Sequence, residues 1–113
     1  MAESKLKDLS MAFSVDILKL CDKIKGHYSI VNQLERSATS IGANIHEANY
    51  AQGTKDFISK LEIALKEASE TGYWLELLYR TNYIDKQTYK TLNEQCTSIR
   101  VMLIASCKTV KSK

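Results

Sequence analysis

Apolar residues recur along the chain at three- and four-residue steps in four separate stretches. This spacing places side chains on one face of an α-helix, whereas a half-buried strand would show strict alternation. The four stretches cover residues 5–25, 29–51, 54–80 and 85 onward. The sequence therefore predicts four amphipathic helices and no sheet.

The apolar stripes of these helices define the expected core. In chain order, the stripe residues are Leu6, Leu9, Phe13, Ile17, Leu20, Ile24, Ile30, Leu34, Ile41, Ile45, Ala48, Phe57, Leu61, Ala64, Leu65, Ala68, Gly72, Leu75, Leu92, Cys96, Ile99, Leu103 and Val110. Helices of about 20 residues are about 30 Å long, and short connections force consecutive helices to run antiparallel. We therefore expect an all-α fold, with residues 1–113 forming one antiparallel up-down-up-down four-helix bundle domain.

Cap and turn residues mark the expected helix ends. Gly26 is a typical stop after the first helix, and residues 81–84 indicate a turn after the third. Ser29, Thr54 and Asp85 precede or open apolar stretches and are candidate N-caps, because their side-chain oxygens can accept from free backbone N–H groups.

Composition supports a globular chain without a membrane segment. Hydrophobic residues make up 44% of the 113 residues, there is no proline, and no apolar run is long enough to span a bilayer. The N-terminal residues carry charges throughout and do not resemble a signal peptide, so we expect a cytoplasmic protein. Cys21, Cys96 and Cys107 lack C-x-x-C spacing and are interpreted as buried free thiols.

Positive charge is concentrated in the last quarter of the chain. The net charge is +3, yet residues 86–113 hold six basic residues against Glu94 alone. On a helix, five of these cations fall within an arc of about 80°; they are Lys86, Lys90, Arg100, Lys108 and Lys111. Such a ribbon can track a phosphate backbone. The alternative interpretation is an ordinary solvated face.

The first helix adds further positive charge beside its core face. Lys5, Lys19 and Lys23 lie on one flank of this helix, and Asp16 interrupts them.

The third helix carries a second stripe, rotated by about 130° from its core stripe. Its members are Ile63, Glu67, Glu70, Trp74 and Leu77. Tryptophan is enriched at protein interfaces, so Ile63, Trp74 and Leu77 are predicted to lie in an oligomer interface. A helix that is simply broad on its buried side is the alternative.

The second helix has a line of small and charged residues away from its core face. Arg36, Ser40, Ala43, Glu47 and Tyr50 make up this line. Small side chains allow close approach of another backbone, and Arg36 and Glu47 can form charge-assisted contacts. We therefore add Arg36, Ser40 and Glu47 to the predicted oligomer interface, with a solvated polar face as the alternative.

No catalytic or metal-binding motif is complete. His46-Glu47 begins an H-E-x-x-H pattern, but Tyr50 stands where the second histidine would be. Neither histidine has a glutamate three residues before it, as a di-iron bundle requires. We expect neither enzymatic activity nor a metal or other cofactor, and a metal or redox enzyme is the least favoured class.

Several runs of this sequence resemble one known family. These runs are NQLERSATSIGANIHEA at 32–48, DFI at 56–58, IALKEA at 63–68, YWL at 73–75 and NYI at 82–84. They are similar to the bacterial four-helix bundle family encoded in intervening sequences of large-subunit ribosomal RNA genes, often described as ribosomal-protein-like. The similarity covers about residues 8–107. Within the longest run, Arg36, Ser40, Asn44 and Glu47 match the family motif.

The resemblance implies specific partners. Characterised members form ring-shaped homopentamers, and the accessory variability protein of diversity-generating retroelements is a related branch that binds a reverse transcriptase and nucleic acid through a basic surface. Two functions remain open for this chain. One is a non-catalytic oligomer that contacts RNA or DNA phosphates through Lys86, Lys90, Arg100 and Lys108. The other is an oligomeric scaffold for a protein partner.

Overall fold

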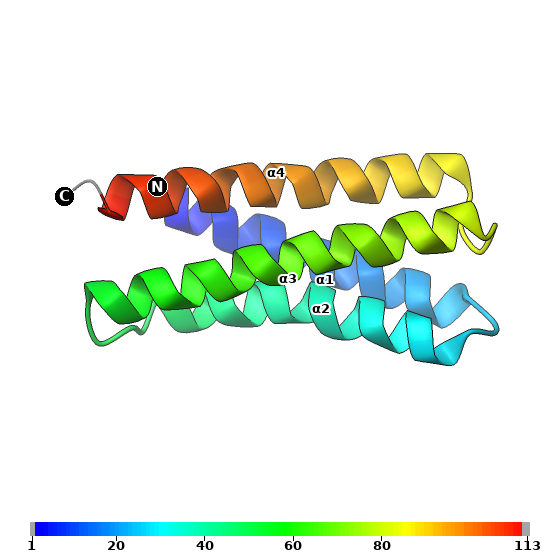
Figure 1. The fold of residues 1–113 in the computed structure, drawn as a ribbon, viewed down its shortest axis with the longest axis horizontal. Helices are drawn as coiled ribbons and strands as arrows, with labels where there is room; N and C mark the ends of the chain where they lie inside the picture. The colour runs from blue at the N-terminus through cyan, green and yellow to red at the C-terminus, as the bar shows by residue number, and fades with distance from the viewer. Residues whose placement is uncertain (1, 112–113) are drawn as a thin grey trace.

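The computed structural model describes residues 2–111, with side chains from residue 5 onward, and contains four helices in that range (Figure 1). In chain order they are α1 (Ala2–Lys23), α2 (Tyr28–Ala48), α3 (Thr54–Arg80) and α4 (Lys86–Lys111). No strand is present among the described residues. The predicted all-α fold is confirmed.

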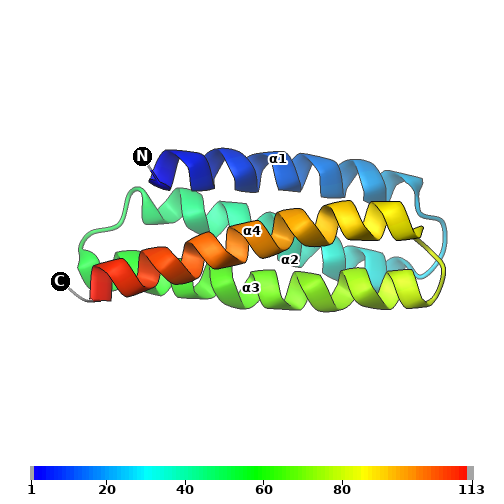
Figure 2. The same cartoon turned by 90° about the horizontal axis from the view of Figure 1, so that it is seen from above.

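The helices run up, down, up and down around one core (Figures 1 and 2). Each helix packs against two others, in the cyclic order α1, α2, α3, α4 and back to α1. The seam between α2 and α3 is the most extensive and the seam between α4 and α1 the least. This is the up-down-up-down bundle that the short connections predict.

The predicted apolar stripes form the core. Phe13, Ile17, Leu34, Ile41 and Leu75 are fully buried and come from three of the helices. From α4, Leu92, Cys96, Ile99 and Leu103 complete the interior. Other stripe residues are partly buried at its edge, namely Leu9, Leu20, Ile30, Phe57 and Leu65.

The start of α4 is capped as predicted. The backbone N–H of Thr88 donates to the Asp85 carboxylate at 2.7 Å. This bond from the Thr88 backbone, together with one from its side chain, lowers the pKa of Asp85 below its ordinary value. The residues before it, 81–84, form a turn in which Asn82 has a left-handed φ of 67°.

Other predicted helix ends were wrong by one to three residues. Ser29 is not an N-cap, because α2 already begins at Tyr28 and is preceded by His27 in a left-handed conformation (φ 46°). Thr54 is the first helical residue of α3, so the N-cap position belongs to Gly53. The first helix stops at Lys23 rather than residue 25, and the second stops at Ala48 rather than residue 51.

All three thiols are free and buried, as predicted. Burial raises the pKa of Cys96 to about 11 and is the main cause of a similar rise at Cys21. Such thiols act as small apolar side chains, because the reactive thiolate is scarce at neutral pH. Within residues 2–111, no helix has the length and apolar character needed to cross a membrane.

Candidate nucleic-acid interface and oligomer contacts

The predicted basic ribbon lies along the outer face of α4. Lys86, Lys90 and Lys108 are exposed, and Arg100 is half-buried. None of the four forms an ion pair with another described residue. At a rise of 1.5 Å per residue, they extend over about 33 Å of helix. Their positive charges are therefore available to an external anion.

Two contacts of α4 show on which side of its outer face this ribbon lies. Lys111, its last member, pairs with Glu62 of α3 at 2.8 Å. On the opposite flank of α4, Gln95 donates to the carboxylate of Asp16 in α1 at 3.1 Å. The ribbon therefore lies on the α3 side of the outer face, and Lys111 differs from the other four cations in having an anionic partner.

Two apolar residues interrupt the ribbon. Val101 is 58% exposed and Ile104 is 38% exposed. Single exposed apolar side chains are common, but this pair lies among the cations that are candidates for phosphate contact. It is a feature that a protein surface would cover better than a phosphate backbone.

The two lines predicted for the oligomer interface meet at one seam. Arg36 of α2 pairs with Glu67 of α3 at 3.1 Å and also with Glu70. Further along, Glu47 of α2 pairs with Lys60 of α3 at 3.4 Å. Because α2 and α3 are antiparallel, these pairs run along the outer edge of their contact. Arg36 and Glu47 therefore have ionic partners within their own chain, and contact with a second copy stays a prediction.

Trp74 is largely accommodated within its own chain. Its ring is half-buried and packs against the core, and its indole N–H donates to Glu70 at 3.0 Å. Glu70 thus joins Trp74 to Arg36 of the neighbouring helix. The interface role of Trp74 stays a prediction, but the amount of apolar surface that α3 exposes is smaller than the sequence indicates.

The remaining predicted interface residues differ in exposure. Ile63 is 40% exposed, whereas Leu77 and Ser40 are half-buried. The Ser40 carbonyl accepts from the Asn44 side chain at 2.9 Å, a bond within α2. Of the predicted apolar interface residues, Ile63 is the one most open to contact.

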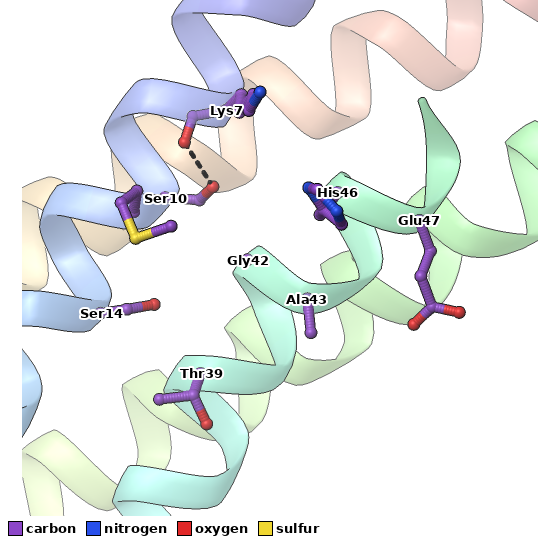
Figure 3. Close-up of a pocket in the computed structure, with 9 residues that line it drawn as sticks. Lys7, Ser10, Ser14, Thr39, Gly42, Ala43, His46 and Glu47 are labelled. Carbon is purple, nitrogen blue, oxygen red and sulfur yellow. Dashed lines mark hydrogen bonds between the residues drawn. The ribbon is translucent and has the colours of Figure 1, made fainter. Parts of the chain in front are cut away.

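Sequence reasoning missed an apolar groove between α1 and α2 (Figure 3). It has a volume of about 490 Å³ and is lined largely by small side chains. Ser10 and Ser14 of α1 face Gly42 of α2, where an added methyl group would lie 3.4 Å from the Ser14 hydroxyl oxygen. These small residues let α1 and α2 approach each other closely, and their short side chains leave the groove open on the outer side of the contact.

An exposed apolar strip borders this groove on α1. Met11 (63% exposed), Val15 and Leu18 make up the strip. Their spacing of four and three residues is the same signal that identified the core stripes, so the sequence contained it. It was overlooked because the stronger stripe of Phe13 and Ile17 accounts for the helix by itself.

Comparison with known proteins identifies the family. The model of the 23S rRNA-intervening sequence protein family matches residues 2–105. The chain belongs to this family. None of the curated proteins matches this chain.

A solved structure shares both the fold and much of the sequence of this family member. It is a crystal structure of a protein of unknown function from the S23 ribosomal protein family of Bacteroides thetaiotaomicron. The two chains are 47% identical, the TM-score is 0.91, and the match covers 96% of this chain and 99% of that one. The family resemblance noted in the sequence is thus confirmed, whereas the relation to the retroelement branch stays a prediction.

Proposed function

We propose that this family member is a non-catalytic, oligomeric protein that associates with nucleic acid through a basic surface, without reading its sequence. The observation that carries the proposal is the set of unpaired cations on the outer face of α4. Lysine and arginine side chains neutralise phosphates and release condensed counterions, a contribution that does not depend on base identity.

The ribbon also has the shape that backbone contact requires. Lys86 and Lys108 lie near opposite ends of α4, and Lys90 and Arg100 lie between them on the same face. A nucleic acid running along α4 would meet phosphate-binding groups at several points, with no cavity for an extruded base needed.

The test is binding of the purified chain to labelled structured RNA and to duplex DNA by fluorescence anisotropy. We expect binding at about 50 mM salt and a loss of affinity of at least tenfold by about 200 mM. Absence of binding to both at low salt would eliminate the proposal.

A charge-reversal variant tests the residues. Lys90→Glu combined with Arg100→Glu should abolish binding, because each change replaces an attraction by a repulsion. Lys7→Glu combined with Lys55→Glu is the matched control, since it makes the same change in net charge at two exposed positions outside the ribbon. Equal losses in both variants would show that net charge, and not this ribbon, determines affinity.

Val101 and Ile104 favour a second candidate, an oligomeric scaffold that binds a protein partner through the same face of α4. Their exposure within the ribbon is the specific observation behind it. Val101→Ser with Ile104→Ser would weaken a protein partner and spare nucleic acid. Lys90→Glu with Arg100→Glu would do the reverse.

Self-association is part of the proposed function and has its own test. Light scattering of the unmodified chain should report an oligomer, a pentamer by family resemblance. Ile63→Glu should shift it towards monomer, with unchanged helicity in circular dichroism, because Ile63 is exposed and its replacement leaves the core intact. Trp74→Glu is a less specific variant, since Trp74 also packs against its own core. A monomeric unmodified chain would refute assembly.

A further inference from the structure

A groove with charged and polar side chains on both walls lies between the C-terminal half of α1 and the N-terminal half of α4. Its volume is about 390 Å³. The lining residues are Asp16, Lys19, Leu20, Lys23, Gln87, Thr88, Thr91 and Leu92.

The α1 wall of the groove supplies positive charge. Lys19 and Lys23 are exposed, lie one turn apart on the same side of α1, and form no ion pair with a described residue. Asp16 is the one carboxylate in the lining, and it already accepts a hydrogen bond from Gln95. The lining therefore carries a formal charge of +1, from two lysines and one aspartate.

The α4 wall supplies uncharged hydrogen-bonding groups. The Gln87 amide donates to the Thr91 hydroxyl oxygen at 3.2 Å. Because Thr91 is the acceptor in this bond, its own O–H remains able to donate outward. Threonine and glutamine side chains are, with lysine and arginine, common donors to phosphate oxygens in nucleic-acid complexes.

We propose that the α1–α4 groove binds the phosphate backbone of a nucleic-acid strand, and that Lys19 and Lys23 hold it there. This inference rests on the proposed function and gives it a second contact surface. Lys86 and Lys90 lie on the same turns of α4 as Gln87 and Thr91, about 100° away around the helix. A strand that follows the ribbon would therefore cross the outer face of α4 at this end of the bundle to enter the groove.

The test compares two double variants of equal charge. Lys19→Gln with Lys23→Gln removes both cations of the groove. Lys7→Gln with Lys55→Gln removes two exposed cations that lie outside it. Using a labelled oligouridylate in about 50 mM salt, we expect the groove variant to lose about tenfold in affinity and the control to lose much less. The slope of log K against log salt should also fall by about one to two for the groove variant.

The substitution Asp16→Asn should change the affinity in the opposite direction. The asparagine oxygen can still accept from Gln95, so the substitution removes a negative charge and keeps the local hydrogen bond. We expect affinity for the oligouridylate to rise by about two- to fivefold.

These experiments distinguish two negative results: that the groove does not bind a strand, and that the chain does not bind nucleic acid at all. Loss of affinity that is equal in the groove and control variants, with no gain in Asp16→Asn, would overturn the groove and leave the ribbon as the binding surface. Failure of the unmodified chain to bind at low salt would overturn the proposed function itself. Circular dichroism and urea unfolding of each variant show whether a loss of binding reflects a loss of fold.

Discussion

The Thr71 hydroxyl of α3 donates to the Ser37 hydroxyl of α2 at 2.9 Å, and both residues are fully buried. Ser37 in turn donates to the Leu34 carbonyl, and Thr71 also lies 2.8 Å from the Glu67 carbonyl oxygen. These two residues place a polar contact in an otherwise apolar seam. An axial shift of α2 against α3 would break the bond between the two hydroxyls and leave each with its contact to its own helix alone, so the bond favours one register.

The first prediction concerns this pair. Ser37→Ala should lower the free energy of unfolding by about 1 kcal/mol, because it removes a buried acceptor. Thr71→Val should cost a similar amount. The double variant should cost less than the sum of the two, with a coupling of about 1 kcal/mol, since either single variant already removes the bond between the two hydroxyls. Urea unfolding of the four proteins measures the coupling, and strictly additive losses would contradict it.

The second prediction distinguishes the two faces of α3. Leu61 is buried, and Leu61→Ala should cost about 2–5 kcal/mol through lost burial and a residual cavity. Ile63, two residues away, is exposed, and Ile63→Ala should change the stability of the isolated bundle by less than about 0.5 kcal/mol. The comparison is made by urea unfolding at a protein concentration where assembly does not contribute. A Leu61→Ala loss within experimental error would contradict the core assignment.

A third prediction concerns glycines inside helices. A methyl group at Gly72 would have no neighbouring atom within 4 Å, so Gly72→Ala should stabilise the protein by about 0.5–1 kcal/mol through helix propensity. At Gly42 the methyl would lie 3.4 Å from the Ser14 hydroxyl oxygen. Gly42→Ala should therefore raise the free energy of unfolding by less than Gly72→Ala does. Thermal unfolding gives the order of the two, and a larger gain at Gly42 would show that α1 is free to move away from α2.

The fourth prediction is a loss of stability at alkaline pH. In the folded chain, burial holds the pKa of Cys96 at about 11, above its ordinary value of 9.0. Between these values the unfolded chain has lost the thiol proton and the folded chain has kept it, so deprotonation favours unfolding. The contribution is complete below pH 9 and declines as the pH approaches 11.

Urea midpoints measured from about pH 8 to about pH 11 test this dependence. In Cys96→Ala, stability should decline less steeply with rising pH, because the variant lacks this titrating thiol. The contribution of all other groups to the pH dependence should stay the same. An identical slope in the variant would show that Cys96 does not cause the alkaline loss; Cys21, whose pKa burial also raises, would then be the next thiol to replace.

Local signals sufficed to predict most of the fold. The three- and four-residue spacing identified the core of every helix, since burial of one face is what stabilises these segments. Asp85 was predicted as a cap because a carboxylate just before a helix has a direct acceptor role. The prediction of Ser29 as an N-cap was wrong because α2 begins one residue earlier, at Tyr28, directly after His27 in a left-handed conformation.

The candidate site could be predicted only in part, because it depends on relations between helices. The cations of α4 were identified from one helix alone. The pairing of Arg36 with Glu67 and Glu70 was missed, since it requires the register of α2 against α3. The α1–α4 groove was missed for the same reason. Lys19 and Lys23 were identified on α1, but their position opposite Thr91 depends on the register of α4 against α1.

An even number of antiparallel helices brings the first turn of α1 and the last turn of α4 to the same end of the bundle (Figure 2). The α1–α4 groove, which begins at Asp16 and extends to Lys23, lies towards the other end. A fluorophore, an affinity handle or a surface tether attached near Ala2 or Lys111 would therefore stay clear of the groove. Chains immobilised through either terminus would keep the groove accessible, so the proposed binding of a strand can be followed with terminal labels alone.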